Sequence, residues 1–229
     1  MSRESMLVVR EATAPHGRAS APGTIIGAVD GLVLRLVRDD DAEAIIALIS
    51  AVWSEYPDKV LVAADDMPEL LRPATSYAAC GGRFWVVEAN GRIIGTVALQ
   101  PGEEPGVVEL QKLYVVRGIR RNGLGRFLCE LVEREARAQG AHAIELWSDV
   151  KLNDAHRRYE SLGYLRSGDI RRLDDTSKTV QYYYRKALDD AAAGIAPAAP
   201  GEDDVVHRFR HWQAAFAARA GGTVPWAQQ

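Results

Sequence analysis

Residues 107–126 read VVELQKLYVVRGIRRNGLGR and combine a strand, a turn and the start of a helix. The apolar run Val107–Val116 is typical of a β-strand. From Gly123 to Gln139, apolar residues recur at the spacing of one helical face, which predicts a long helix. Between the two lies the turn Arg120–Gly125. Because backbone N–H groups and the positive end of a helix dipole meet in such a turn, we expect it to bind an anion.

The charge of this segment differs from that of the whole chain. The 229 residues carry a formal net charge of −3. The segment 111–126 has no acidic side chain and holds the basic residues Lys112, Arg117, Arg120, Arg121 and Arg126. We therefore expect a local phosphate site and no nucleic-acid partner, because nucleic-acid binders usually carry a basic excess. Glycines at positions 123 and 125 would let a pyrophosphate approach the backbone closely.

The flanking sequence predicts a mixed α/β domain. Strand Leu32–Val37 precedes a helix that Asp39 and Asp40 can cap, and a second helix begins near Pro68. Asn90-Gly91, between two apolar runs, predicts a tight antiparallel hairpin. After the long helix we expect a buried strand, a short helix and a last strand, at Ala143–Trp147, Asp154–Leu162 and Thr179–Ala187.

Composition divides the chain around one core-forming region. Residues 1–30 are rich in Ala, Gly and Pro and are interpreted as an extension, followed by a domain at 31–188. The run AAAGIAPAAPGEDD within 189–204 has the composition of a linker. The tail, 205–229, contains a predicted helix whose docking partner the sequence leaves open. With 47% hydrophobic residues, the chain can bury one sizeable core.

The sequence also favours a cytoplasmic location with no membrane partner. Its apolar runs fall short of the roughly 20 residues that span a bilayer, and Met1–Arg10 lacks the apolar stretch of a secretory signal. His207 and His211 have a metal-binding spacing but no third ligand in the sequence pattern, so we expect no metal. Sheet edges and the tail would suit a homodimer, although no residue pattern requires one.

Arg120, Gly123 and Gly125 together resemble the R/Q-x-x-G-x-G/A signature of the GNAT acetyltransferase superfamily. The resemblance extends over roughly 32–188 and includes the segment AHRRYESLGY at 155–164. It implies an α/β (α+β) fold with a mixed sheet of about six or seven strands, including a splayed parallel pair, and about four flanking helices. It also implies acetyl-CoA as the co-substrate and an amine as the acceptor.

The resemblance assigns roles to individual positions. The splayed strands would be Val107–Val116 and Ala143–Trp147, and acetyl-CoA would lie between them. Its pantetheine arm would contact the backbone at Leu113–Val115, and its pyrophosphate the turn. The residues implied in cofactor binding are Leu113, Tyr114, Val115, Arg120, Arg121, Asn122, Gly123, Leu124, Gly125 and Arg126.

Two side chains are candidates for the proton transfers that acyl transfer needs. Tyr159 matches the tyrosine whose hydroxyl acts in the family as a general acid toward the leaving sulfur. Glu109, flanked by Val108 and Leu110, is a candidate general base, since burial would raise its pKa. Trp53, Tyr56 and Trp147 are expected to form acceptor-pocket walls, and an excess of acids over 39–70 would attract a cationic amine.

Two other readings remain open from the sequence. A domain of the same fold could hold acyl-CoA as a ligand without catalysis, which would keep the phosphate turn but not require Glu109 or Tyr159. A nucleotide-dependent oxidoreductase would use a glycine-rich turn as well. That class needs G-x-G-x-x-G opening a parallel β-α-β unit, whereas the strands before this turn are predicted to be antiparallel.

Overall fold

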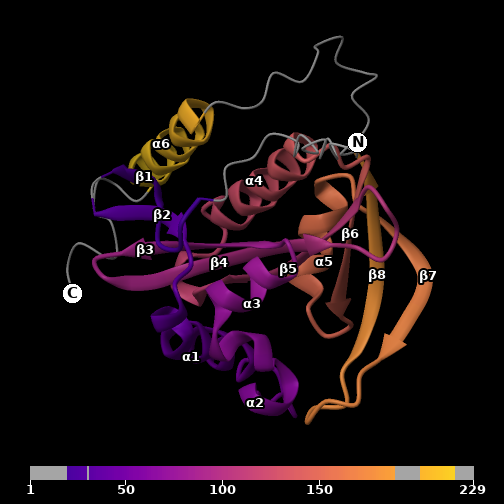
Figure 1. Ribbon diagram of the computed structural model, residues 1–229. Helices are drawn as coiled ribbons and strands as arrows, with labels where there is room; N and C mark the ends of the chain where they lie inside the picture. The colour runs from indigo at the N-terminus through magenta and orange to yellow at the C-terminus, as the bar shows by residue number, and fades with distance from the viewer. Residues whose placement is uncertain (1–19, 30, 189–201, 220–229) are drawn as a thin grey trace, which may run out of the picture.

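The computed structural model describes residues 20–29, 31–188 and 202–219. Within these ranges the chain forms one eight-stranded sheet in the order β1-β2-β3-β4-β5-β6-β8-β7, with helices on both faces (Figure 1). The strands are β1 Ile25–Val29, β2 Leu32–Leu36, β3 Arg83–Ala89, β4 Arg92–Pro101, β5 Val107–Val115, β6 Ala143–Asp149, β7 Leu165–Arg172 and β8 Val180–Ala187. The helices are α1 Ala42–Trp53, α2 Ala63–Asp66, α3 Pro73–Ala79, α4 Leu124–Ala138, α5 Asn153–Ser161 and α6 Glu202–Arg219.

Each face of the sheet has its own hydrophobic core. Helices α1, α2 and α3 lie on one face, and α4 and α6 lie on the other (Figure 1). The core on the α4 side includes Leu128, Val132 and Tyr184, whereas the opposite core includes Ile45, Ile49 and Phe84. The sheet is therefore buried on both faces over its central strands, which accounts for the nearly continuous apolar run in β4.

The first five strands pair antiparallel in chain order, and the last three of them are the meander that the sequence predicts. The β3–β4 hairpin turns at Asn90 and Gly91, whose φ angles are 47° and 76°. Two consecutive positive φ angles are what a tight hairpin turn requires, and Asn and Gly adopt them at low cost. The meander delivers β5 to the centre of the sheet, next to β6.

Strands β5 and β6 are parallel but pair over only a short length. Their register runs from Val107 opposite Ala143 to Glu109 opposite Glu145, although both strands continue further. β5 is also bulged, since Lys112 has a φ of 51° and the register with β4 shifts there. The splayed parallel pair expected from the resemblance is thus present, and the gap opens after Glu109 and Glu145.

The expected fold class is confirmed, but the counts of strands and helices were too low. β1 lies within the range interpreted as an extension and is defined by its pairing with β2. β7 has mostly exposed residues, so it lacks the apolar alternation of a recognisable strand. Four-residue α2 and the tail helix α6 complete the set of six α-helices in the described ranges.

Two expected domain boundaries shift. The sheet begins at Ile25, before residue 31, and α6 begins at Glu202, inside the range interpreted as a linker. Residues 1–19 of the expected extension, 189–201 of the expected linker and 220–229 of the tail lie outside the described residues. In the described ranges, no helix combines the length and apolarity needed to cross a bilayer.

Candidate active site

Two adjoining cavities lie where β5 and β6 separate. The first, the turn cavity, is lined by Tyr56, Val115, Arg120, Gly125, Asp154 and Arg158, among others. The second, the tryptophan cavity, is lined by Trp53, Asp66, Trp147, Asp149, Tyr159 and Asp175, among others. Leu113, Tyr114, Leu152 and Ala155 line both cavities. The two cavities therefore share one wall and form a single site with two compartments.

The glycine-rich turn leads directly into α4 at the turn cavity. Arg121 and Gly123 have φ angles of 65° and 88°, and α4 begins at Leu124 without a side-chain cap. The first N–H groups of an α-helix have no partner within the helix, so an uncapped start leaves donors for an external acceptor. The local backbone thus fits an anion, as the sequence predicts.

The arginine side chains of the turn are largely engaged with the protein itself. Arg120 donates two hydrogen bonds to Glu55, at 2.8 and 2.7 Å, and one from Nε to the carbonyl oxygen of Val115 at 2.9 Å. Arg126 pairs with Glu130 in the next helical turn at 2.8 Å. Arg120 therefore fastens the turn to Glu55, just after the end of α1, and the backbone N–H groups of 121–126 stay the predicted phosphate ligands.

Arg158 on α5 is a cationic residue of this site that the sequence did not single out. A Cβ atom added to Gly125 would lie 3.1 Å from Arg158 Nε and 3.2 Å from its Cζ, so the guanidinium lies directly against that glycine. Among the described residues no acid pairs with Arg158, whereas neighbouring Arg157 pairs with Asp154. Because Gly125 has no side chain, the Arg158 guanidinium can pack directly beside the turn.

Tyr159 lies in the tryptophan cavity, as a general acid would need to. Its ring contacts those of Tyr164 and Tyr184, with centroids 5.8 and 5.7 Å away, and the residue is 6% exposed. Burial raises the pKa of the Tyr159 hydroxyl above its ordinary value of 10.0. The hydroxyl therefore stays protonated at neutral pH and can donate a proton.

Glu109 lies just outside both cavities, on the face of the sheet that carries α1–α3. Its Oε2 accepts hydrogen bonds from Gln111 Nε2 at 2.9 Å and Gln100 Nε2 at 3.2 Å, and Arg171 lies 3.8 Å from Oε1. Gln111 itself lines the tryptophan cavity. Glu109 therefore contacts the lining of that cavity through this glutamine.

The three aromatic residues expected as pocket walls divide between the two compartments. Trp53 and Trp147 line the tryptophan cavity, whereas Tyr56 lines the turn cavity. Trp53 Nε1 donates to the hydroxyl oxygen of Tyr114 at 3.3 Å, and burial raises the pKa of Tyr114 to about 12. The Trp53–Tyr114 contact joins α1 to β5 at the boundary of the two cavities.

Carboxylates contribute to the tryptophan cavity from three separate segments. Asp149, at the end of β6, forms a buried ion pair with Lys59, so its charge is compensated. Asp66 and Asp175 accept backbone hydrogen bonds, from Thr176 N at 2.8 Å and Thr179 N at 2.7 Å respectively. For Asp66, burial opposes ionisation, but its hydrogen bonds outweigh burial and lower the pKa. Asp66 and Asp175 therefore add carboxylates to a wall that also contains Lys112, which pairs with Glu69.

A larger cavity of about 410 Å³ lies elsewhere, between Pro22, Tyr77, Phe84 and the end of α4. It contains none of the residues implicated by the sequence, and its lining is mainly apolar. Size alone therefore does not identify the site. The cavities at the β5–β6 gap combine the uncapped helix start, titratable groups and apolar walls that an active site needs.

Comparison with known proteins identifies the family. The sequence profile of the acetyltransferase (GNAT) family matches residues 45–164. YjgM of Escherichia coli (strain K12), named as an uncharacterized N-acetyltransferase, is 34% identical over 137 residues, which are 58% of this chain and 81% of that protein. Because the family profile covers more than half of the chain, the chain belongs to the GNAT acetyltransferase family.

Other relatives agree with this assignment. N-acetyltransferase 8 of Mus musculus is 30% identical over 53% of this chain, but the match spans only 54% of that protein. The structure of yncA, a putative acetyltransferase from Salmonella typhimurium with its cofactor acetyl-CoA, superposes with a TM-score of 0.54 at 21% identity. That superposition covers 73% of this chain and 100% of the other, and it supports the fold.

Proposed function

We propose that this chain transfers the acetyl group of acetyl-CoA to a primary amine, by direct attack of the amine while both are bound. The observation that carries this proposal is the gap between β5 and β6, with the uncapped turn at one end and Tyr159 at the other. An elongated thioester fits such a site, since its phosphates and its reactive end need different surroundings.

In this proposal the turn cavity holds the phosphate-bearing part of acetyl-CoA. The N–H groups from Arg121 to Arg126 bind pyrophosphate, and Arg158 supplies the side-chain cation in place of Arg120. The backbone of Leu113, Tyr114 and Val115 borders the gap, where β5 no longer pairs with β6. These groups position the thioester so that its acetyl end reaches the tryptophan cavity.

Tyr159 is the proposed general acid toward the departing sulfur. Its raised pKa keeps the hydroxyl protonated, and its place in the tryptophan cavity puts it at the reactive end. Glu109 stays a predicted general base, acting through a water molecule that accepts the proton of the amine and passes one to the carboxylate. Hydrogen bonds from two glutamines hold the Glu109 carboxylate in one position.

We propose a cationic amine as the acceptor class. Asp66 and Asp175 carry negative charge in a cavity whose other walls include the indole rings of Trp53 and Trp147. Carboxylates attract cations. The indole rings serve as apolar walls, because Lys59 and Arg171 already lie 4.6 and 4.5 Å from their centroids. The location proposed for this reaction is the cytoplasm. A homodimer stays a prediction, which sedimentation of the purified chain would test.

Titration calorimetry with acetyl-CoA tests the proposal most directly. Gly123→Glu places a charged side chain at a φ of 88° in the turn, so we expect binding to fall at least 100-fold. Gly118→Glu is the matched control: it adds the same charge nearby, where a Cβ meets no atom within 4 Å. If the unmodified chain does not bind acetyl-CoA, or both variants bind it equally well, the proposed site is wrong.

A further inference from the structure

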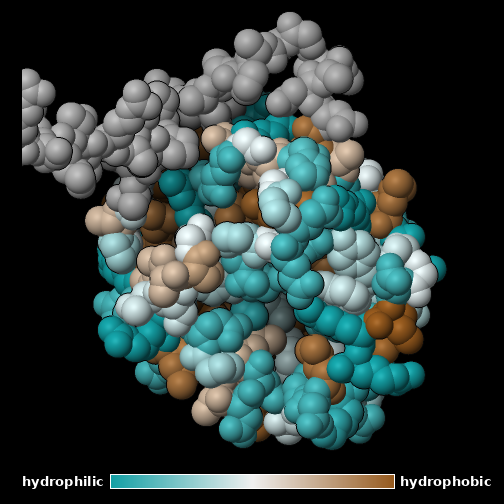
Figure 2. Space-filling view, turned by 45° about the vertical axis from the view of Figure 1, so that its right-hand side comes forward, coloured by the Kyte–Doolittle hydropathy of each residue, from teal (hydrophilic) through white to brown (hydrophobic). Residues whose placement is uncertain are grey.

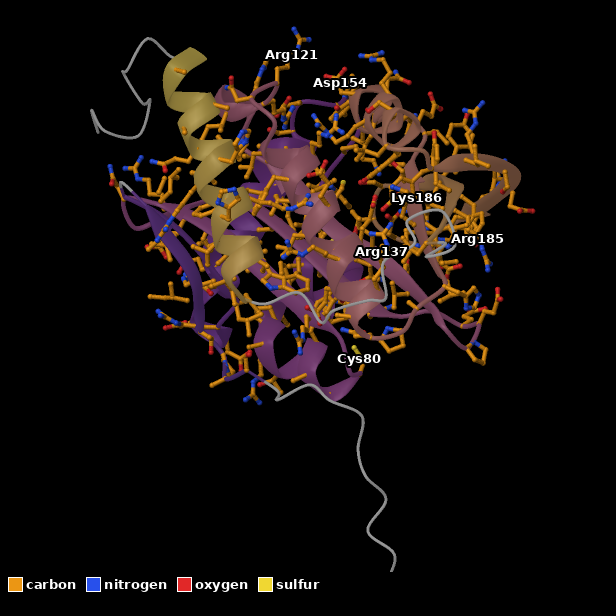
Figure 3. The ribbon with its side chains drawn as sticks, turned by 90° about the horizontal axis from the view of Figure 1, so that it is seen from above. Cys80, Arg121, Arg137, Asp154, Arg185 and Lys186 are labelled. Atoms are coloured by element: carbon orange, nitrogen blue, oxygen red, sulfur yellow. The ribbon has the colours of Figure 1, made fainter. Side chains whose placement is uncertain are left out.

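The C-terminal helix α6 lies outside the residues that match the family, yet it packs onto the element that follows the phosphate turn. It contacts β1 and α4 (Figures 1 and 3). Phe209, Trp212 and Phe216 on its inner face are 0%, 7% and 1% exposed. The tail helix, whose docking partner the sequence left open, therefore completes the hydrophobic core of this same chain.

Trp212 is the residue of α6 that reaches the turn itself. Its indole Nε1 donates a hydrogen bond of 2.9 Å to the carbonyl oxygen of Asn122. Its ring also stacks on Phe127, in the first turns of α4, with centroids 6.1 Å apart and planes 22° apart. Stacking on Phe127 fixes the position of the indole ring. The indole N–H then holds the Asn122 carbonyl through its hydrogen bond.

That peptide group also contains the N–H of Gly123. In a trans peptide the carbonyl and the N–H point in opposite directions, and the described chain contains no cis peptide bond. A carbonyl of Asn122 held toward α6 therefore orients the Gly123 N–H away from α6. Arg121 and Gly123, the residues before and after Asn122, have positive φ angles. The Asn122–Gly123 peptide lies just before α4, which begins at Leu124.

The side chain of Asn122 also forms bonds within the turn. The side chain of Asn122 donates to the carbonyl oxygens of Ile119 and Arg120 at 3.3 and 3.4 Å, which are long distances for hydrogen bonds. The bond from Trp212 is shorter and comes from a packed ring with little freedom to move. The turn thus takes part of its conformation from a helix about 90 residues later in the chain.

We propose that Trp212 is a positioning residue for the cofactor: through the Asn122 carbonyl it fixes the peptide that presents the Gly123 N–H to a phosphate. Docking of α6 is then coupled to the affinity for coenzyme A. This inference rests on the proposed function, because it assumes that the turn binds the phosphates of coenzyme A. Coupling of this kind is reciprocal, so coenzyme A must also stabilise the docked α6.

The first test compares Trp212→Phe with Phe216→Leu by calorimetric titration of coenzyme A into the full chain. Trp212→Phe keeps an aromatic ring but removes the donor, and we expect the Kd to rise roughly fivefold, as for one net hydrogen bond. Phe216→Leu loosens the same helix without touching the donor. It should lower the melting temperature and leave the Kd within about twofold at a temperature well below unfolding.

Equal affinity of Trp212→Phe and the unmodified chain would overturn the inference. An equal loss in both variants would overturn the role of the Trp212 donor, because loosening of α6 alone would then explain the effect. If the unmodified chain fails to bind coenzyme A, the proposed function is wrong, and this inference is overturned with it. Binding by the unmodified chain with no difference among the variants overturns the role of Trp212 alone.

The second test needs no substitution and so applies even if Trp212→Phe does not fold. Hydrogen exchange of the unmodified chain is measured with and without coenzyme A. We expect slower exchange at 202–219 as well as at the turn, because binding should stabilise the docked helix. Protection confined to the turn and the β5–β6 gap would contradict the proposed coupling.

Discussion

The turn cavity and the tryptophan cavity share a wall but are built in different ways. In the turn cavity, the groups proposed to bind phosphate are the backbone N–H groups of one continuous segment, 121–126, together with Arg158 from α5, although α1 and residues 152–155 also line the cavity. The tryptophan cavity takes side chains from α1, α2, β6 and the segment between β7 and β8. A binding site made of consecutive backbone groups keeps one specificity, whereas a site made of distant side chains can change its acceptor by substitution.

The surroundings of Arg120 and Arg158 give the same contrast within the turn cavity. Both arginines line it, but Arg120 is paired with Glu55, whereas no acid among the described residues pairs with Arg158. Figure 3 shows Arg121 and Asp154 at one end of the molecule, where the turn and α5 approach each other.

Figure 2 shows a largely hydrophilic face, with its hydrophobic side chains in separate patches.

The largest expected effect comes from removing the hydroxyl of Tyr159, which lines the tryptophan cavity. Tyr159→Phe should lower kcat by about 100-fold or more, which is typical for the loss of a general acid. The Kd for acetyl-CoA should change little, because the hydroxyl lies beyond the turn cavity. Steady-state kinetics with a series of amines, together with calorimetry, would measure both quantities.

The pH profile sharpens the same prediction. Because burial raises the pKa of Tyr159, the hydroxyl stays protonated as the pH rises toward 10.0, its ordinary pKa. We therefore expect kcat in the unmodified chain to rise with pH, as the amine loses its proton, without an alkaline decline below about pH 9. If kcat declines at alkaline pH and Tyr159→Phe removes that decline, the pKa of Tyr159 is not raised. That result would contradict the argument from burial.

An intermediate effect is expected for Arg158→Gln, which tests whether the turn cavity binds phosphate through this side chain. Loss of one charged hydrogen bond should raise the Kd for acetyl-CoA about tenfold. The effect should shrink at high salt. Arg157→Gln is the matched control, because its guanidinium is 70% exposed and pairs with Asp154. Equal Kd values for the two variants would place the phosphates elsewhere.

The smallest expected effect concerns the acceptor side. Asp175→Asn should raise the KM for a cationic amine about threefold and leave the Kd for acetyl-CoA unchanged, since one charge is removed from a partly hydrated cavity. Asp174→Asn, at an adjacent residue whose side chain is 96% exposed, is the control. A similar change in KM for an uncharged amine would contradict the electrostatic explanation.

The comparison of the two cavities also sets the limit of prediction from sequence. The turn, the β3–β4 hairpin and α4 were predicted because their signals are local: positive-φ residues, helical spacing and the order of elements. Tyr159 was selected through the family resemblance; in the structure it lines the tryptophan cavity, and its catalytic role stays a prediction. Arg158 was missed because its neighbour Arg157 has the same side chain, and only packing against Gly125 distinguishes the two.

The sequence by itself determined the family, the glycine-rich turn and the meander before it, because backbone preferences and the R-x-x-G-x-G spacing act over a few residues. The tertiary structure decided what depends on distant contacts: the pairing of β1, the attachment of Arg120 to Glu55, the walls of the tryptophan cavity and the contact of Trp212 with Asn122. Those features join residues far apart in the chain, so their energies exist only after the chain has folded.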